Sequence, residues 1–170
     1  MQVNKKSKGL SPIFVVVLTV FIDITGYGII IPLLPDFTKQ FQASPIALGV
    51  FIASFSIMQF FFSPLLGTAS DRKGRKPILL LSLLISLIGF TIFSFANSYL
   101  MLFLSRVIAG IATERAVAQA YVADITDHKS RIKEMGKIGA AFGAGFIIGP
   151  AMGGVLSTFS FAMAGYAAMG

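Results

Sequence analysis

Long, nearly uncharged apolar runs divide this chain, and short clusters of basic residues separate them. A membrane-spanning helix needs about 20 mostly apolar residues, which is close to the length of each run. Membrane-spanning strands have about 10 residues and alternate in polarity, and the runs do neither. The pattern therefore predicts a single all-α integral membrane domain over residues 1–170. Its five expected spans are residues 12–35, 45–67, 77–96, 99–123 and 135–156.

The composition excludes most soluble classes of protein. Charged residues make up 12% of the chain, against roughly 25% in a soluble domain, and so short a chain cannot bury this much apolar surface in water. A soluble enzyme, a disordered tail and an ordinary nucleic-acid-binding module are thereby excluded. Because the chain has no Cys and one His, we expect no metal site and no cofactor. We recognise no nucleophile–base pair or phosphate loop, and expect no enzyme.

The basic residues predict the orientation, because cytoplasmic loops carry an excess of Lys and Arg. The clusters lie in the N-terminal tail and in the loops after the second and fourth spans. The loop after the first span holds Lys39 alone, and the loop after the third holds none. We therefore expect the N-terminus and Gly74 to be cytoplasmic and Ser98 to be outside, in the cell membrane. The clustered residues are Lys5, Lys6, Lys8, Arg72, Lys73, Arg75, Lys76, Lys129, Arg131, Lys133 and Lys137.

Ionisable residues inside spans are costly and mark candidate functional sites. Asp23 lies near the middle of the first span, and Arg106, Glu114 and Arg115 lie in the fourth. In an undistorted helix Arg106 and Arg115, nine residues apart, point to opposite faces. Arg106 either faces a cavity or clamps neighbouring helices. Arg115 either extends to the cytoplasmic surface or pairs with an acid on another helix.

The loop after the second span has an unusual arrangement of charge. Asp71 and Gly74 lie among four cations. Anchoring at the cytoplasmic surface explains the cations, but it does not explain Asp71 or the spacing from Gly67 to Asp71 and Gly74.

The fifth span is rich in glycine. Gly145, Gly149 and Gly153 recur every four residues, so they form one stripe along which another helix can approach closely. Pro150 removes a backbone donor and is expected to bend this helix.

Four motifs, in order, resemble the major facilitator superfamily. Residues 67–79 resemble its G-x-L-a-D-r-x-G-r-k loop motif, with Ala69 in place of Leu. Residues 102–110, with Arg106, resemble its fourth-helix motif. Residues 21–35 are similar to the first helix of drug/proton antiporters of the tetracycline-efflux branch. The antiporter motif G-x8-G-x3-G-P-x2-G-G is matched by Gly136, Gly145, Gly149, Pro150, Gly153 and Gly154.

The resemblance implies a six-helix half built as a three-plus-three inverted repeat, of which this chain supplies five helices. It implies that Asp23 and Arg106 line the pathway of substrate and proton. It also implies that the loop motif gates the cytoplasmic side, with Asp124 as the partner of Arg75, and that the bend at Pro150 helps to switch conformations. The gate residues implied are Gly67, Asp71, Arg72, Gly74, Arg75, Lys76 and Asp124.

The function implied is efflux of a small amphipathic, drug-like molecule in exchange for protons. An apolar environment favours the neutral form of a carboxyl, so Asp23 can take up a proton on one side and release it on the other. The residues identify neither the substrate nor whether proton or sodium is the coupling ion. The alternative is a membrane fragment that does not transport, or an assembly partner.

The chain reads as though it stopped at the start of a sixth helix, because the 14 residues after Leu156 are too few for a span. Asp23 and Arg106 would then face the position of the missing half. Exposing either to lipid costs roughly 2.5–3.5 kcal/mol. We therefore expect the chain, in a lipid bilayer, to bind the missing C-terminal half, to self-associate or to be poorly stable.

Overall fold

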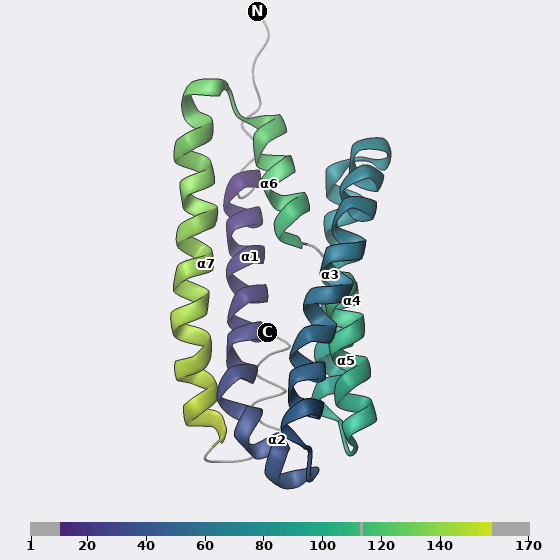
Figure 1. The fold of residues 1–170 in the computed structure, drawn as a ribbon. Helices are drawn as coiled ribbons and strands as arrows, with labels where there is room; N and C mark the ends of the chain where they lie inside the picture. The colour runs from purple at the N-terminus through teal and green to yellow at the C-terminus, as the bar shows by residue number, and fades with distance from the viewer. Residues whose placement is uncertain (1–10, 113, 158–170) are drawn as a thin grey trace, which may run out of the picture.

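Helices account for nearly all of residues 11–112 and 114–157, the part of the chain that the computed structural model describes, and this part contains no strand. The three Lys residues of the tail and the start of the expected sixth helix lie outside it. In chain order the elements are α1 (Pro12–Ile30), the 3-10 helix η1 (Ile31–Leu33), α2 (Leu34–Gln40), α3 (Pro45–Lys73), α4 (Arg75–Ser94), α5 (Tyr99–Ile111), α6 (Glu114–Ile125) and α7 (His128–Ser157) (Figure 1).

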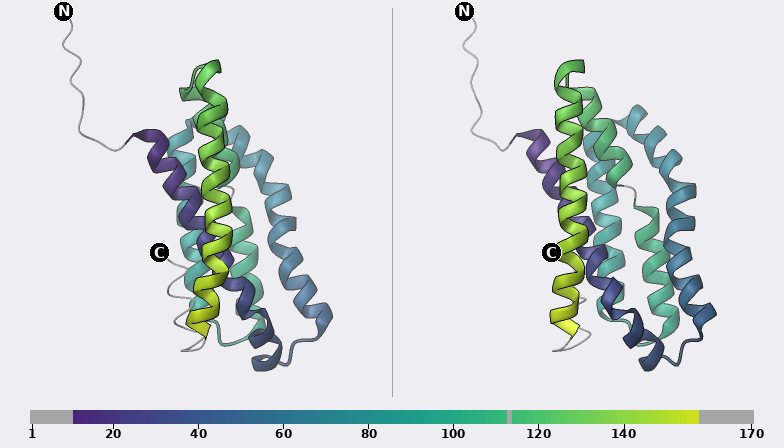
Figure 2. Two further views of the ribbon diagram at one scale, coloured as in Figure 1. Left: turned by 90° about the vertical axis from the view of Figure 1, so that its left-hand side faces the viewer. Right: turned by 60° about the vertical axis from the view of Figure 1, so that its left-hand side comes forward.

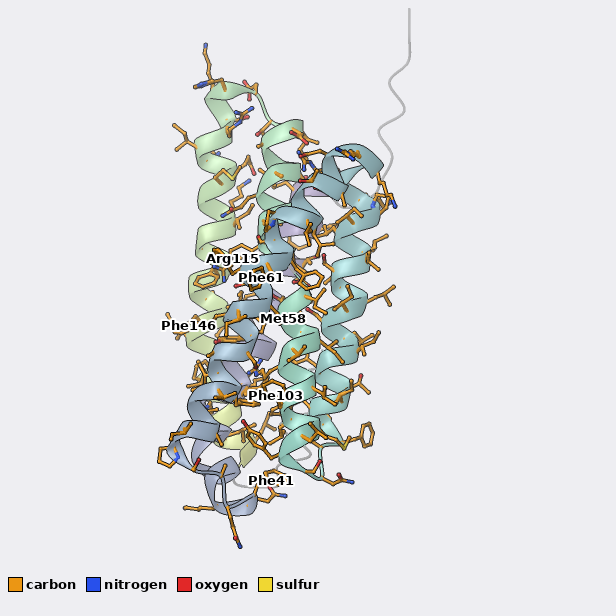
Figure 3. The ribbon with its side chains drawn as sticks, turned by 45° about the vertical axis from the view of Figure 1, so that its right-hand side comes forward. Phe41, Met58, Phe61, Phe103, Arg115 and Phe146 are labelled. Atoms are coloured by element: carbon orange, nitrogen blue, oxygen red, sulfur yellow. The ribbon has the colours of Figure 1, made fainter. Side chains whose placement is uncertain are left out.

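Four helical segments are long and apolar enough to cross a membrane, namely Pro12–Leu33, α3, α4 and α7. Much of their apolar surface points outward, as the side chains along the helices show (Figure 3). Phe61 on α3 is 60% exposed, and Ile147 on α7 is 74% exposed. A surface of this kind suits lipid or a further protein surface better than water. The all-α membrane fold predicted from the sequence is confirmed.

Local sequence explains where the long helices begin and end. Proline occupies the first turn of α1 and of α3, where its missing N–H removes no helical hydrogen bond. Ser44 caps α3 by accepting a hydrogen bond from the Ala47 amide at 3.2 Å. Gly74 separates α3 from α4 with a φ of +95°, which residues with a side chain rarely adopt. The tight turn expected at Gly74 is therefore present.

The fourth expected span differs from the prediction of one helix over residues 99–123. α5 ends at Ile111, Ala112 has an extended backbone with ψ of 130°, and α6 begins at Glu114. α5 packs against α3 and α4, whereas α6 also reaches α1 and α7. The two pieces of this segment therefore share α3 and α4 as neighbours, and α6 adds α1 and α7 (Figure 1).

The apolar core consists of two clusters at different heights along the helices. One contains Val16 and Val20 of α1 with Ile78 of α4. The other contains Leu33 of η1 and Phe93 of α4. Since α1 and α4 contribute to both clusters, the middle of each helix lies between them. The polar residues of those middle segments are thus held between two packed apolar layers.

α1 and α7 have the most extensive contact of any pair of described elements, and Figure 2 shows them side by side. The glycine stripe of α7 forms this contact. A Cβ atom placed on Gly149 would lie 2.6 Å from the Thr25 carbonyl oxygen and 2.8 Å from the Gly28 Cα. One placed on Gly145 would lie 3.0 Å from the Phe21 carbonyl oxygen. The two backbones therefore touch almost directly.

Replacing Gly149 by Ala is expected to lower the free energy of unfolding by about 1–3 kcal/mol, because the added methyl group forces α1 and α7 apart. Gly143→Ala is the matched control on the same helix, since a Cβ there meets no heavy atom within 4 Å. The measurement is detergent-induced unfolding of the purified chain. Equal midpoints for the two variants would contradict this account of the contact.

Candidate functional site

A cavity of about 260 Å³ lies in the middle of the helices, between the two apolar clusters. Six of the helices contribute to its walls, from α1 to α7 with α2 excepted. The polar and charged residues that line it are Asp23, Ser56, Gln59, Ser86, Arg106, Glu114 and Arg115. Its aromatic residues are Tyr27, Phe55, Phe90, Phe142 and Phe146.

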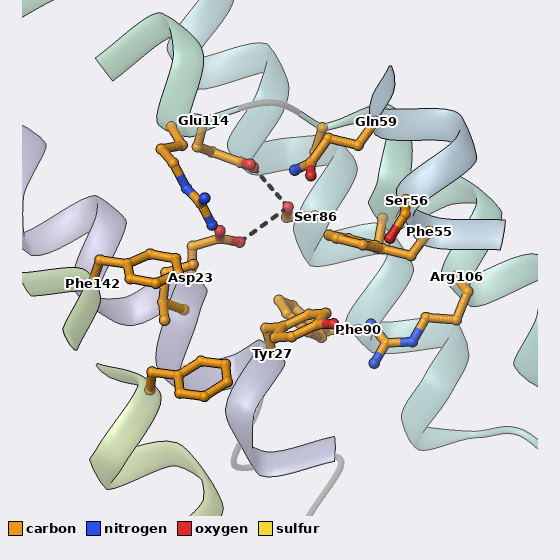
Figure 4. Close-up of a pocket in the computed structure, with 15 residues that line it drawn as sticks. Asp23, Tyr27, Phe55, Ser56, Gln59, Ser86, Phe90, Arg106, Glu114 and Phe142 are labelled. Atoms are coloured by element: carbon orange, nitrogen blue, oxygen red, sulfur yellow. Dashed lines mark hydrogen bonds between the residues drawn. The ribbon is translucent and has the colours of Figure 1, made fainter. Parts of the chain in front are cut away.

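Two carboxyl groups approach one hydroxyl in this cavity (Figure 4). The Ser86 hydroxyl oxygen lies within hydrogen-bond distance of Glu114 Oε1, at 2.6 Å, and 3.4 Å from Asp23 Oδ1. Asp23 belongs to α1, Ser86 to α4 and Glu114 to the first turn of α6. Three helices are therefore tied together by a single serine.

Arg106 is held among aromatic rings. Its guanidinium carbon lies 5.2 Å from the ring centres of both Tyr27 and Phe51 and 5.6 Å from that of Phe55. Such cation–π contacts stabilise a desolvated cation. Arg106 is 5% exposed and lines the cavity, which is the first of its two expected positions. It also contacts the rings of Tyr27 on α1 and of Phe51 and Phe55 on α3.

Arg115 lines the same cavity as Arg106, contrary to the opposite faces expected for an undistorted helix. The physical reason is the interruption after Ile111, which resets the phase of α6 relative to α5. The Arg115 guanidinium lies 4.1 Å from the ring centre of Phe142 on α7. Arg115 is exposed, and no ion pair joins it to an acid among the described residues.

A second cavity, of about 410 Å³, adjoins the first between α3 and α6. Ser56, Gln59 and Arg115 line both. The second cavity extends along α6 to Gln119, towards the end of the helices that carries Asp124. It offers a polar approach to the central cavity from that end.

At that same end, Arg75 joins α3, α4 and α6. Its Nη1 lies 2.5 Å from Asp71 Oδ1 and donates to the Ser70 hydroxyl at 2.6 Å. Its Nε donates to Asp124 Oδ2 at 2.7 Å. The structure thus brings together the three charged residues Asp71, Arg75 and Asp124.

The remaining motif residues lie apart from this network. Arg72 and Lys76 are exposed, and a Cβ on Gly67 would meet no atom within 4 Å. The same holds for Gly136 and Gly154 of α7, whereas Gly153, like its stripe partners, faces α1. Pro150 lies inside α7, which continues to Ser157.

Sequence reasoning missed Ser86 and most of the aromatic lining. The signal for Ser86 is weak but present, since Ser82 and Ser86 recur at a spacing of four in an otherwise apolar run and so share one face of α4. In the described ranges, no group of three or more acidic or His residues is placed to hold a metal ion.

Comparison with known sequences places these features in a family. A family model described as Major Facilitator Superfamily matches residues 16–170. The class H tetracycline resistance protein of Pasteurella multocida is 38% identical over 87% of this chain and 38% of its own length. The class B protein of Escherichia coli is 41% identical, covering 82% and 36%. Multidrug resistance protein 2 of Bacillus subtilis (strain 168) is 38% identical, covering 89% and 38%.

The chain therefore spans about two-fifths of the length of these relatives. Among solved structures, the human organic anion transporter MFSD10 (TETRAN) superimposes with a TM-score of 0.82 at 26% identity, covering 94% of this chain and 45% of that protein. Sequence and structure thus agree, and the chain belongs to the major facilitator superfamily of membrane transporters.

Proposed function

We propose that this chain forms one half of a proton-coupled efflux antiporter for a small amphipathic molecule. The observation that carries the proposal is the central cavity, in which a carboxyl group at Asp23 and a guanidinium at Arg106 share walls with aromatic rings. Similarity to proteins named for tetracycline and multidrug resistance supports efflux of a drug-like molecule.

The cavity suits a guest with both apolar and charged parts. Aromatic faces such as Tyr27 and Phe142 bind flat apolar groups and cations, while Asp23 can bind either a proton or a cationic group of the guest. Because one carboxylate cannot do both at once, proton and guest compete. Each then favours a different state of the cavity, which is the thermodynamic requirement for exchange.

In a second part of the proposal, a further set of helices completes the transport path. Transporters of this kind work by rocking one half against the other around a central site. The relatives are more than twice as long as this chain, which supports a C-terminal half as the partner. Self-association of this chain is the other arrangement that would cover the exposed apolar faces.

The orientation that we propose puts the N-terminus, the α3–α4 turn and the α6–α7 turn in the cytoplasm. The two turns lie at the same end of the helices (Figure 1), and their loops carry the clustered Lys and Arg residues. The α4–α5 turn, at the opposite end, then faces outside.

Cysteine labelling tests this orientation in a chain without native Cys. In intact cells an impermeant thiol reagent is expected to label Asn97→Cys and to leave Lys73→Cys unlabelled until the cells are opened. Lys73 is preferable to its neighbour Gly74, whose positive φ disfavours any side chain. The reverse labelling pattern would invert the topology.

The charge network of Arg75 is proposed to close the cytoplasmic side. Asp71→Asn removes one of the two carboxylates that hold this guanidinium between α3, α4 and α6. We expect the initial rate of transport to fall several-fold while the amount of protein in the membrane changes little. Lys73→Gln, an exposed change on the same turn, serves as the control. An unchanged rate for Asp71→Asn would leave this loop with an anchoring role only.

The proposed function is tested by dye efflux from cells that express this chain together with its second half and lack other drug pumps. Efflux of a fluorescent amphipathic cation is expected to stop when the proton gradient is collapsed and to continue when only the sodium gradient is removed. Efflux that stops when only the sodium gradient is removed would make sodium the coupling ion. No efflux from untreated cells would favour the alternative of a non-transporting assembly partner.

A further inference from the structure

The carboxyl group of Glu114 has no role in the pathway described above. Glu114 is 4% exposed and lies in the first turn of α6. Its Oε1 is 2.6 Å from the Ser86 hydroxyl oxygen, and that oxygen is 3.4 Å from Asp23 Oδ1. The single hydroxyl of Ser86 thus stands between two carboxyl groups that come from different helices (Figure 4).

Counting hydrogens shows what this arrangement needs. A serine hydroxyl carries one hydrogen to donate, and an ionised carboxylate can only accept. With both carboxylates ionised, only one of them receives the hydrogen of Ser86. With one proton added, the protonated carboxyl donates to the Ser86 oxygen and Ser86 donates to the other, so every group is satisfied. The geometry is therefore complete with one shared proton.

The burial of the two carboxyls, together with the charges around them, indicates which one holds this proton. The titratable and charged residues on the cavity are Asp23 and Tyr27 of α1, Arg106 of α5, and Glu114 and Arg115 of α6. The lining residues from α3, α4 and α7 are uncharged. Glu114 is 4% exposed, whereas Asp23 is half-buried, and among the described residues no ion pair joins Glu114 to a cation. Burial disfavours the charged form of a carboxyl, so Glu114 is the better placed of the two to hold the proton.

Arg106 shows independently that this cavity is built to receive a guest. Arg106 is 5% exposed, and its side chain lines the cavity. Among residues 11–112 and 114–157 it contacts aromatic rings but has no hydrogen bond or ion pair. Buried guanidinium groups need acceptors, so the guest that fits here brings hydrogen-bond acceptors to Arg106.

We propose that Glu114 is a second proton-binding residue of the transport path, which shares one proton with Asp23 through Ser86. At rest Glu114 is protonated, and Asp23 is ionised in the cavity that Arg115 also lines. In transfer, the Glu114 proton passes to the Ser86 oxygen while the Ser86 proton passes to Asp23, so the proton count is unchanged and the negative charge moves to Glu114. The 3.4 Å contact must shorten for this step, and the amino end of α6 stabilises the charge that Glu114 then carries.

The role in coupling rests on the proposed function, but the test measures proton binding alone. The chain has two glutamates, Glu114 and Glu134, so ¹³C labelling of glutamate carboxyls gives two NMR resonances from the full chain in lipid nanodiscs. At neutral pH one is expected at the position of a protonated carboxyl. The other is expected at the ionised position, because Glu134 pairs with Lys137 at 2.7 Å.

Three variants make the result specific. Glu114→Gln keeps an oxygen acceptor for Ser86 and is expected to remove the protonated resonance, while the control Glu134→Gln removes only the ionised one. Asp23→Asn abolishes the like charge beside Glu114, so the Glu114 resonance is expected to move to the ionised position at the same pH.

Two results overturn the proposal. One is a Glu114 resonance at the ionised position in the unchanged chain at neutral pH, which would make the residue a structural hydrogen-bond acceptor. The other is a protonated resonance that Asp23→Asn leaves in place, which would show that the two carboxyls are not coupled. If the resonances behave as expected but cells show no dye efflux, the proposed function is contradicted, and proton sharing between Glu114 and Asp23 still holds.

Discussion

Asp23→Asn is expected to reduce substrate-driven proton movement to the level of liposomes without protein. The substitution keeps the size of the side chain and its contact with Ser86, but it removes the group that can alternate between a proton and a cationic guest. In the proposed mechanism no other group of α1 in the cavity can do so. The measurement uses the transporter, formed with its second half, in liposomes that contain a pH-sensitive dye.

Asp36→Asn provides the matched control for this loss. Asp36 lies on α2, a short helix that contributes no residue to the central cavity, so its neutralisation is expected to leave proton movement near the unchanged rate. Proton movement that survives Asp23→Asn and responds to substrate would remove Asp23 from the coupling mechanism, and Glu114 would become the first candidate to replace it.

The purified 170-residue chain alone is expected to give no substrate-driven proton movement in the same liposomes. The exposed apolar faces of α3 and α7 show how much surface a partner would cover, with Phe60 at 76% and Ile147 at 74% exposed. Without a second half nothing rocks against the helices described, and alternating access has no moving part.

A contrary result would be informative about assembly. Substrate-dependent proton movement from the 170-residue chain, abolished by Asp23→Asn, would show that copies of this chain replace the second half. Chemical crosslinking in the liposomes would then be expected to trap a dimer. The same experiment with the C-terminal half of a relative added would separate self-association from pairing of unlike halves.

The positions of the long helices followed from their composition, because a lipid environment leaves the backbone few options other than a helix. The turn at Gly74 and the close approach of another helix to the glycine stripe of α7 were also predictable, since each depends on residues without a side chain at a fixed spacing. These features are local, or repeat with the period of a helix. Sequence patterns therefore carry them well.

The centre of the molecule was less predictable. The phase of Arg115 was wrong because it depends on the interruption near Ala112, and no proline or glycine at that position signals a break. In the sequence Ser86 is 28 positions from Glu114 and 63 positions from Asp23, yet it lies beside both. Contacts of this kind depend on how the helices are rotated against one another, which a single sequence does not encode in any short pattern.

The separation of α5 from α6 has a consequence for how recognition can change over time. The last carbonyl groups of one helix and the first amide groups of the next have no partners within their own helices, and this junction lies beside the cavity at Ala112 and Glu114. Hydrogen bonds offered by main-chain atoms are the same for every side chain that occupies the position. A guest that uses them would keep part of its binding energy through many point mutations, so selection for a new substrate would act first on the aromatic walls.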